Sequence, residues 1–163
     1  MFDDLIDANR TYAEQFHDSG VKGKAAKGLA VLTCIDSRID PLAMLGLKPG
    51  DAKIVRNAGA RVTDDALRSL ILAVNLLDVR RICVVQHTEC AMAGATDEQV
   101  AQRVTEAGGV DASGFTFLAM TDQASALRDD IARLRACPLI PTSTEIAGFT
   151  FDVRTGKLVA ADI

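Results

Sequence analysis

The chain has 163 residues, of which 48% are hydrophobic and 25% charged, with a formal net charge of −4 at pH 7. This length fits a single domain, residues 1–163, with a hydrophobic core of its own. The acidic balance and the absence of Trp exclude the basic stripes and aromatic platforms of nucleic-acid binders, and no apolar run is long enough to span a bilayer. The first residues carry no apolar signal segment, so we expect a cytoplasmic protein whose four cysteines are reduced.

The first predicted elements are a helical arm and two strands. Residues 3–16 form the arm. Its apolar side chains available for one face are Leu5, Ile6, Tyr12 and Phe16. Residues 28–35 are a continuous apolar run, which is typical of a strand buried on both faces. A Pro-Gly turn signal precedes the second strand, residues 52–57.

The remaining elements alternate helices with strands. A helix is predicted over residues 63–77, with a Thr as its N-cap and two Asp residues in its first turn. Residues 81–87 form a third apolar strand. Two more helices, 97–107 and 122–135, lead to a terminal hairpin with strands at 149–153 and 157–160.

This alternation predicts a mostly parallel sheet with right-handed crossovers. In such sheets, ligands bind beyond the carboxyl ends of the strands, where the strand order reverses. Cys34 ends the first predicted strand and His87 ends the third. If these strands are neighbours, two phrases rich in reactive side chains, residues 34–38 and 87–90, meet at this edge of the sheet.

The two phrases contain the ligand types of a catalytic zinc site. Thiolates and imidazoles bind Zn²⁺ tetrahedrally, and three protein ligands with an open fourth position are typical of catalytic zinc. His87 and Cys90 are three residues apart, so one turn can aim both at one ion, and Cys34 supplies the third ligand from the adjacent strand end. Asp36 follows Cys34 by two residues and points to the same face if the strand continues. We therefore predict one Zn²⁺ per chain, in a hydrolase or lyase.

Other interpretations of these residues compete with a metal site. Cys34 or Cys90 alone is more often a buried core residue, and Asp36 with Arg38 is more often a surface ion pair. The joint presence of both cysteines, His87 and the Asp–Arg pair at strand ends favours the metal.

The remaining cysteines and histidine are predicted to lie outside the site. A closed structural site would need a fourth ligand. Cys83 lies four residues before His87 on the same strand, about 13 Å away at roughly 3.3 Å per residue, which is too far for both to bind one ion. Cys83 and Cys137 are therefore predicted to pack in the protein. His17, on the arm, is predicted to be solvated.

The same phrases give the chain a family resemblance. The pattern Cys-x-Asp-x-Arg followed by His-x-x-Cys resembles the signature of the β-class carbonic anhydrases, most closely the short bacterial members. The likeness runs from the arm through Arg56-Asn-Ala-Gly-Ala60 to the terminal hairpin. It implies an α/β fold with sheet order 2-1-3-4, an added antiparallel edge strand and flanking helices. It also implies homodimers, or dimers of dimers, that pair through their N-terminal helices.

The resemblance also implies a reaction and a role for each site residue. Cys34, His87 and Cys90 would bind zinc, while Asp36 and Arg38 would form a catalytic dyad. The implied activity is the reversible hydration of CO₂ to bicarbonate and a proton by zinc-bound hydroxide, a lyase reaction on a small molecule. Since two thiolates offset the charge of the ion, it is a weaker Lewis acid than in a three-histidine site, and we expect activity to rise with pH above neutrality.

The chain also departs from the family pattern. Ala91 stands where the family usually has Gly, which adds a methyl group to the turn beside the metal. The family's aromatic and Gln contacts to substrate have no clear counterparts, and the Trp of one regulatory bicarbonate pocket is absent. Two alternatives stay open: hydrolysis of COS or CS₂ on the same scaffold, and a non-catalytic member that keeps zinc for stability or senses bicarbonate.

Overall fold

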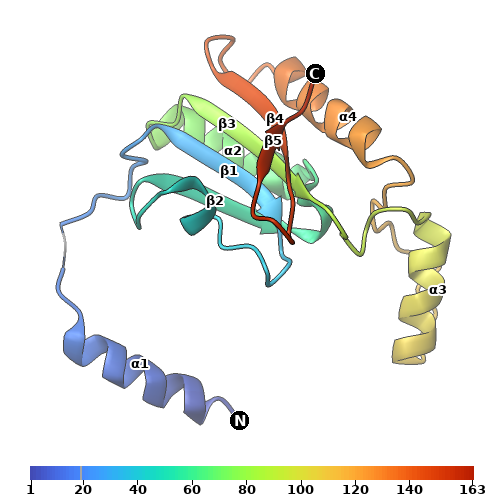
Figure 1. Ribbon diagram of the computed structural model, residues 1–163, viewed down its shortest axis with the longest axis horizontal. Coiled ribbons are helices and arrows are strands. Elements are labelled where there is room, and N and C mark those ends of the chain that lie inside the picture. The colour runs from blue at the N-terminus through green and yellow to red at the C-terminus, as the bar shows by residue number, and fades with distance from the viewer. Residues whose placement is uncertain (19) are drawn as a thin grey trace.

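A five-stranded sheet forms the centre of the protein in a computed structural model that describes residues 1–18 and 20–163 (Figure 1). The strands are β1 (Leu29–Cys34), β2 (Ala52–Asn57), β3 (Arg81–His87), β4 (Glu145–Phe151) and β5 (Leu158–Ala160). Their order is β2-β1-β3-β4-β5; the first four are parallel to one another and β5 is antiparallel to β4. The predicted α/β fold, with order 2-1-3-4 and an antiparallel edge strand, is confirmed.

Helices connect and flank the strands. They are α1 (Asp3–Gln15), α2 (Asp64–Leu76), α3 (Asp97–Gly108) and α4 (Gln123–Ala136), with short 3₁₀ turns at η1 (Ala43–Leu45) and η2 (Ala58–Ala60). Side-chain caps mark where α2 and α4 begin. The Thr63 hydroxyl accepts the Ala66 N–H at 3.2 Å, and the Asp122 carboxylate accepts the Ser125 N–H at 3.0 Å. Each of these bonds satisfies an N–H group that has no partner inside its helix.

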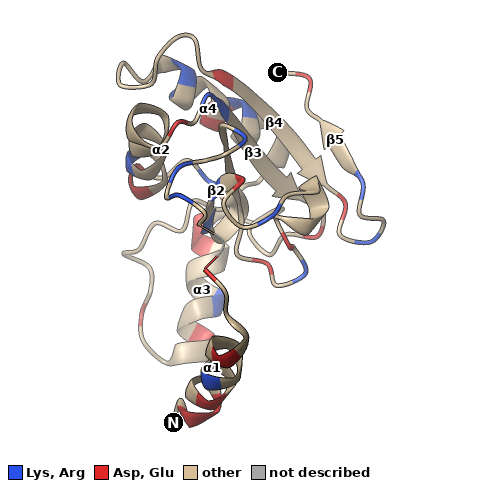
Figure 2. Ribbon diagram, turned by 90° about the vertical axis from the view of Figure 1, so that its left-hand side faces the viewer, with Lys and Arg blue, Asp and Glu red and all other residues tan. Residues whose placement is uncertain are grey.

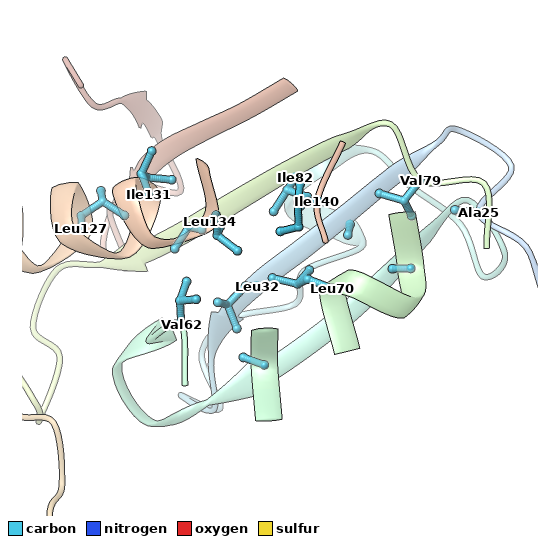
Figure 3. Close-up of a cluster of buried hydrophobic side chains, with 14 residues drawn as sticks. Ala25, Leu32, Val62, Leu70, Val79, Ile82, Leu127, Ile131, Leu134 and Ile140 are labelled. Carbon is cyan, nitrogen blue, oxygen red and sulfur yellow. The ribbon is translucent and has the colours of Figure 1, made fainter. Parts of the chain in front are cut away.

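One face of the sheet is covered by α2 and α4, and the main hydrophobic core lies between them and the strands (Figure 3). Leu32 of β1 and Ile82 of β3 point to this face and pack in the same cluster as Leu70 of α2 and Leu134 of α4. All four side chains are almost completely buried. Burying apolar surface stabilises the fold by about 25 cal/mol per Å². A shift of either strand would expose these side chains, so their burial favours the observed pairing of β1 with β3.

The opposite face carries a second apolar cluster that leads to the ends of the strands. Val31 of β1 and Val85 of β3 belong to it, together with Cys34 and Cys90. Every residue of β1 is buried, which explains the continuous apolar run in the sequence. The side chains at the carboxyl ends of β1 and β3 therefore stand on strands that are fixed from both sides.

The last parallel strand is longer than predicted. β4 begins at Glu145, whereas the sequence pattern predicts a strand only from residue 149. Gly148 interrupts the apolar pattern because helix α4 packs closely there: a Cβ atom at Gly148 would lie 2.6 Å from Ile163 Cδ1 and 3.1 Å from Leu127 Cδ2. The hairpin itself is confirmed, with Phe151 pairing with Leu158 across the turn.

Helix α1 stands apart from the sheet (Figures 1 and 2). The structure describes all of its residues, and none of them is buried. Two acidic residues, Asp3 and Asp4, lie in its first turn. The large apolar side chains exposed on and beside it are Phe2, Leu5, Ile6, Tyr12 and Phe16. Among the described residues, no helix is both long enough and apolar enough to cross a membrane.

Candidate metal centre

The carboxyl ends of β1 and β3 bring the predicted metal ligands together. The two strands are neighbours, with Thr33 opposite Val85, and the Thr33 hydroxyl donates a hydrogen bond to the Val85 carbonyl at 2.9 Å. Cys34 is the last residue of β1, His87 is the last of β3, and Cys90 lies in the turn that follows. Their ligand atoms lie within 4.8 Å of one another, and all three residues are buried.

The His87 ring presents one free nitrogen to this group. Its Nδ1–H donates to the Thr88 carbonyl at 2.8 Å, because a carbonyl oxygen can only accept. Nε2 then carries the lone pair, and it is buried without a hydrogen-bond partner among the described residues. Gln123 of α4 donates to the His87 carbonyl at 2.9 Å and holds the strand end in place. A buried, unpartnered nitrogen whose ring is fixed by its other nitrogen is the usual state of a metal-binding histidine.

Cys34 and Cys90 lie close enough to share a proton. A hydrogen bond from the Cys90 thiol lowers the pKa of Cys34, and the backbone N–H of Gly59 also donates to the Cys34 sulfur, at 3.4 Å. The same contact with Cys34 raises the pKa of Cys90, and burial raises it further. The two sulfurs thus share a hydrogen bond that lowers the pKa of one and raises that of the other, and neither is in a disulfide.

These donors fit a soft or borderline divalent cation. Two sulfurs and one imidazole nitrogen match the ligand preferences of Zn²⁺, and the unpartnered His87 Nε2 is otherwise a costly buried atom. Cys34, His87 and Cys90 would hold the ion from two strand ends, which leaves a fourth position for a small molecule.

Asp36 and Arg38 form a two-point ion pair next to this group. Arg38 donates from Nε to Asp36 Oδ1 at 3.0 Å and from Nη2 to Oδ2 at 2.8 Å, and its backbone N–H also donates to Oδ1. Asp36 Oδ2 lies 3.9 Å from His87 Nε2. The Arg38 hydrogen bonds hold the pKa of Asp36 well below its usual range and raise the pKa of Arg38. Asp36 therefore stays an ionised acceptor beside the free nitrogen.

Arg56 secures the loop that follows β1. It donates from Nε to the Cys34 carbonyl at 2.8 Å and from Nη2 to the Asp36 carbonyl at 2.7 Å. Although the sequence shows Arg56 within a phrase of the family pattern, spacing does not indicate which groups it binds. Its two bonds fix the backbone on either side of Ile35 and so the separation of Cys34 from Asp36.

Glu89 is a second residue that the sequence analysis did not single out. It lies between His87 and Cys90, and its Oε2 accepts a hydrogen bond from Arg38 Nη1 at 3.0 Å. Its other oxygen, Oε1, accepts from Arg154, which follows β4. The Arg154 contact is the main reason that the pKa of Glu89 is lowered. The only signal in the sequence is the position of this acid inside the His-x-x-Cys phrase.

The donor group does not include the other two cysteines or His17. Cys83 is half-buried in the second apolar cluster, where burial raises its pKa. Cys137 packs against the main core. His17 is exposed, and its Nδ1 lies 2.8 Å from the Gln15 carbonyl oxygen. Ala91 is exposed in the turn after Cys90.

Comparisons with known proteins show which family the chain is similar to. A family model described as "Carbonic anhydrase" matches residues 29–113. The chain is 36% identical to "Beta-carbonic anhydrase 1" of Mycobacterium tuberculosis, over 96% of this chain and 94% of that protein. It is 32% identical to "Carbon disulfide hydrolase" of Saccharolobus solfataricus, over 97% of this chain and 89% of that protein. A crystal structure of carbonic anhydrase from Streptococcus mutans matches with a TM-score of 0.90 and 38% identity, covering 99% of this chain and 97% of that one.

Proposed function

The chain belongs to the β-carbonic anhydrase family, and on that premise we propose that it catalyses the reversible hydration of CO₂ to bicarbonate at a Zn²⁺ ion held by Cys34, His87 and Cys90. The observation that supports the metal most directly is the buried, unpartnered Nε2 of His87 next to two sulfurs. The observation that supports catalysis is the ionised Asp36 at the edge of the same group.

The metal and the protein have separate tasks in this proposal. A bound zinc ion supplies a Lewis acid, which lowers the pKa of water so that hydroxide is available near neutral pH. Cys34, His87 and Cys90 bind and place the ion, and their burial limits the access of bulk water. Because two of the three ligands are thiolates, less positive charge remains on the ion, so we expect activity to increase with pH above neutrality.

Asp36 orients the nucleophile. As an ionised carboxylate it can only accept hydrogen bonds, so it binds the O–H of the attacking group and turns a lone pair of that oxygen toward CO₂. Arg38 holds both carboxylate oxygens, which keeps Asp36 charged and fixes its direction. Orientation of this kind contributes to the rate by reducing the number of unproductive arrangements.

The first test of this proposal removes the arginine. In Arg38→Ala, Asp36 is free to turn toward the metal position, so we expect hydration to fall about a hundredfold or more across pH 6 to 9. Arg68→Ala is the matched control, since Arg68 forms an exposed ion pair with Asp65 on α2, away from the site. Near-normal hydration by Arg38→Ala would refute the dyad.

The second test removes a metal ligand. Cys34→Ser keeps the size of the side chain but replaces a thiolate with a hydroxyl, which is a poor zinc ligand. We expect less than one zinc per chain by elemental analysis and a loss of hydration activity. Cys137→Ser, a change in a cysteine that packs against the core, is the control. Stoichiometric zinc and full activity in Cys34→Ser would contradict the ligand assignment.

CS₂ or COS hydrolysis is the second candidate function. It is favoured by the similarity to "Carbon disulfide hydrolase", which extends over almost the whole chain at 32% identity. The residues of the metal centre do not separate these substrates, because all three are small linear molecules open to the same nucleophile. Parallel assays of CO₂, COS and CS₂ on one zinc-loaded preparation decide between them. Turnover of CS₂ or COS without hydration of CO₂ would reverse the assignment.

We also propose that the chain pairs into homodimers through α1, in the cytoplasm. Helix α1 exposes Leu5 and Tyr12 and, within the described residues, buries none of its own side chains. All four cysteines are free thiols, which suits a reducing compartment. Light scattering should give twice the chain mass, or four times for a dimer of dimers, for the wild type and for the control Glu14→Gln. Leu5→Glu/Tyr12→Ser should give at most half of that mass. A monomeric wild type would refute pairing.

A further inference from the structure

We infer that Glu89 is a positioning residue for the reaction, which holds Arg38 from the side opposite Asp36 and so keeps the Asp36 carboxylate in its working orientation. This inference rests on the proposed function for its effect on rate. Its structural part, the restraint of Arg38, rests on contacts alone and can be measured without any substrate.

The contacts of Arg38 divide between two carboxylates. Nε and Nη2 bind the two oxygens of Asp36, and Nη1 binds Glu89 Oε2 at 3.0 Å. Nη2 also donates to the Glu89 backbone carbonyl at 3.3 Å. Because a guanidinium group is planar, fixing Nη1 on one side and Nε on the other leaves it a single orientation. Asp36 and Glu89 together therefore restrain the Arg38 guanidinium group from two sides.

Glu89 is itself held from the far side by a second arginine. Its Oε1 accepts a hydrogen bond from Arg154, in the turn between β4 and β5. The carboxylate thus links Arg38 to the terminal hairpin, and its negative charge lies between two positively charged guanidinium groups. Arg154 is 78% exposed, so solvent weakens its share of the linkage.

The backbone of Glu89 gives independent support. Its φ angle is +58°, a left-handed conformation that favours Gly and is uncommon for a residue with a long side chain. Backbone strain of this kind is retained mainly where the side chain has a task. At Glu89 the left-handed turn directs the carboxylate toward Arg38, while His87 and Cys90 on either side face the donor group.

The test compares Glu89→Gln with wild type in the zinc-loaded protein. Gln keeps the shape but lacks the charge that binds both arginines, so we expect kcat for hydration to fall about tenfold with zinc content unchanged, as for other residues that orient a metal-site group. In an Arg38→Ala background, Glu89→Gln should have no further effect, because the group it positions is gone. Asp65→Asn, which makes the same change in the exposed Arg68 pair, should leave kcat unaltered.

A second readout measures Arg38 directly. The Arg38 Nε–H resonance of ¹⁵N-labelled protein, assigned by its loss in Arg38→Lys, should exchange with water several-fold faster in Glu89→Gln. The Arg68 Nε–H, which donates to Asp65 at 3.1 Å, serves as the internal reference and should not change. Glu89→Gly relieves the left-handed backbone, so it should match or exceed the wild-type melting temperature while still losing activity.

These readouts separate the inference from the proposed function. A wild type without hydration activity would refute the function, while Arg38 Nε–H exchange would still decide whether Glu89 restrains Arg38. Unchanged exchange in Glu89→Gln overturns the inference, as do an unchanged kcat, additive losses with Arg38→Ala, or a loss of zinc that explains the lower rate.

Discussion

Gly59 offers a quantitative test of how the metal centre is packed. It lies in η2 with φ at +77°, and its N–H donates to the Cys34 sulfur. In Gly59→Ala, the new Cβ would lie 3.1 Å from Met120 Cε and 3.3 Å from Met92 Cβ. The Met120 methyl can move, but Met92 Cβ is attached to the backbone and cannot move alone. We therefore expect both a conformational and a packing penalty.

The magnitude follows from these two parts. Placing an alanine in the left-handed region costs about 1 kcal/mol relative to glycine. Crowding a well-packed site adds about 1–2 kcal/mol. The free energy of unfolding should therefore fall by about 2–3 kcal/mol in Gly59→Ala. Displacing the N–H donor from Cys34 should also weaken zinc binding about tenfold.

Urea unfolding of the zinc-free proteins, in the presence of a chelator, measures this loss without a contribution from zinc binding, and Gly46→Ala is its matched control. A separate zinc titration measures the affinity. Gly46 has a similar φ of +62°, but a Cβ there would meet no atom of the described residues within 4 Å. This control should lose only the conformational part, about 1 kcal/mol, with normal zinc affinity. Equal losses in the two variants would show that the contacts around Gly59 carry no packing cost, and the reasoning would fail.

Three further changes test other parts of the structure. Arg61→Ala leaves Asp130, whose side chain is 6% exposed, without its cation, so urea unfolding should show a loss of about 3–5 kcal/mol; a loss below 1 kcal/mol would contradict a buried ion pair. Asp97 accepts backbone N–H groups of residues 117–119, with Ala119 the main cause of its lowered pKa. Since the folded pKa is below the unfolded value of 3.8, this stabilisation is present above that pH and is lost as pH falls through the folded pKa. The melting temperature of Asp97→Asn should therefore be lower than that of wild type at pH 7, and the difference should shrink as the pH falls through the folded pKa of Asp97. A difference that stays constant with falling pH would refute this. Finally, zinc added to metal-free wild type at a hundred times its Kd should raise the free energy of unfolding by about 2.7 kcal/mol. Cys34→Ser should show no such gain.

The strands were predictable wherever burial on both faces leaves an unbroken apolar run. β1 is buried throughout and lies within the predicted run of residues 28–35, and β3 spans Arg81–His87, the residues that the sequence pattern indicates. β2 was located by the Pro-Gly turn signal before it, since its residues are mostly half-buried. The start of β4 was missed because Gly148 interrupts the apolar pattern. A side chain there would clash with Ile163 and with Leu127 of α4, and no local pattern shows such long-range contacts. The caps at Thr63 and Asp122 act within three residues, so the helix starts were visible in the sequence.

The site was predictable to the extent that topology determines it. Adjacent parallel strands bring their carboxyl ends together, so the meeting of Cys34 with His87 and Cys90 follows from the order of β1 and β3. Their role as metal ligands stays a prediction. The contacts of Glu89 with Arg154 were not predictable, because they join a turn to a hairpin 65 residues later and depend on side-chain directions in both.

The origin of the donor group on two separate strands has a consequence for assembly of the fold. Cys34 and His87 are 53 positions apart in the chain, and they meet only after β1 and β3 have paired. An ion bound there would act as a removable cross-link between two distant parts of the chain. A chain whose β1 and β3 have not yet paired would bind the ion only weakly, because its ligands are not yet close together. Metal supply and completion of the sheet would then depend on each other during biosynthesis.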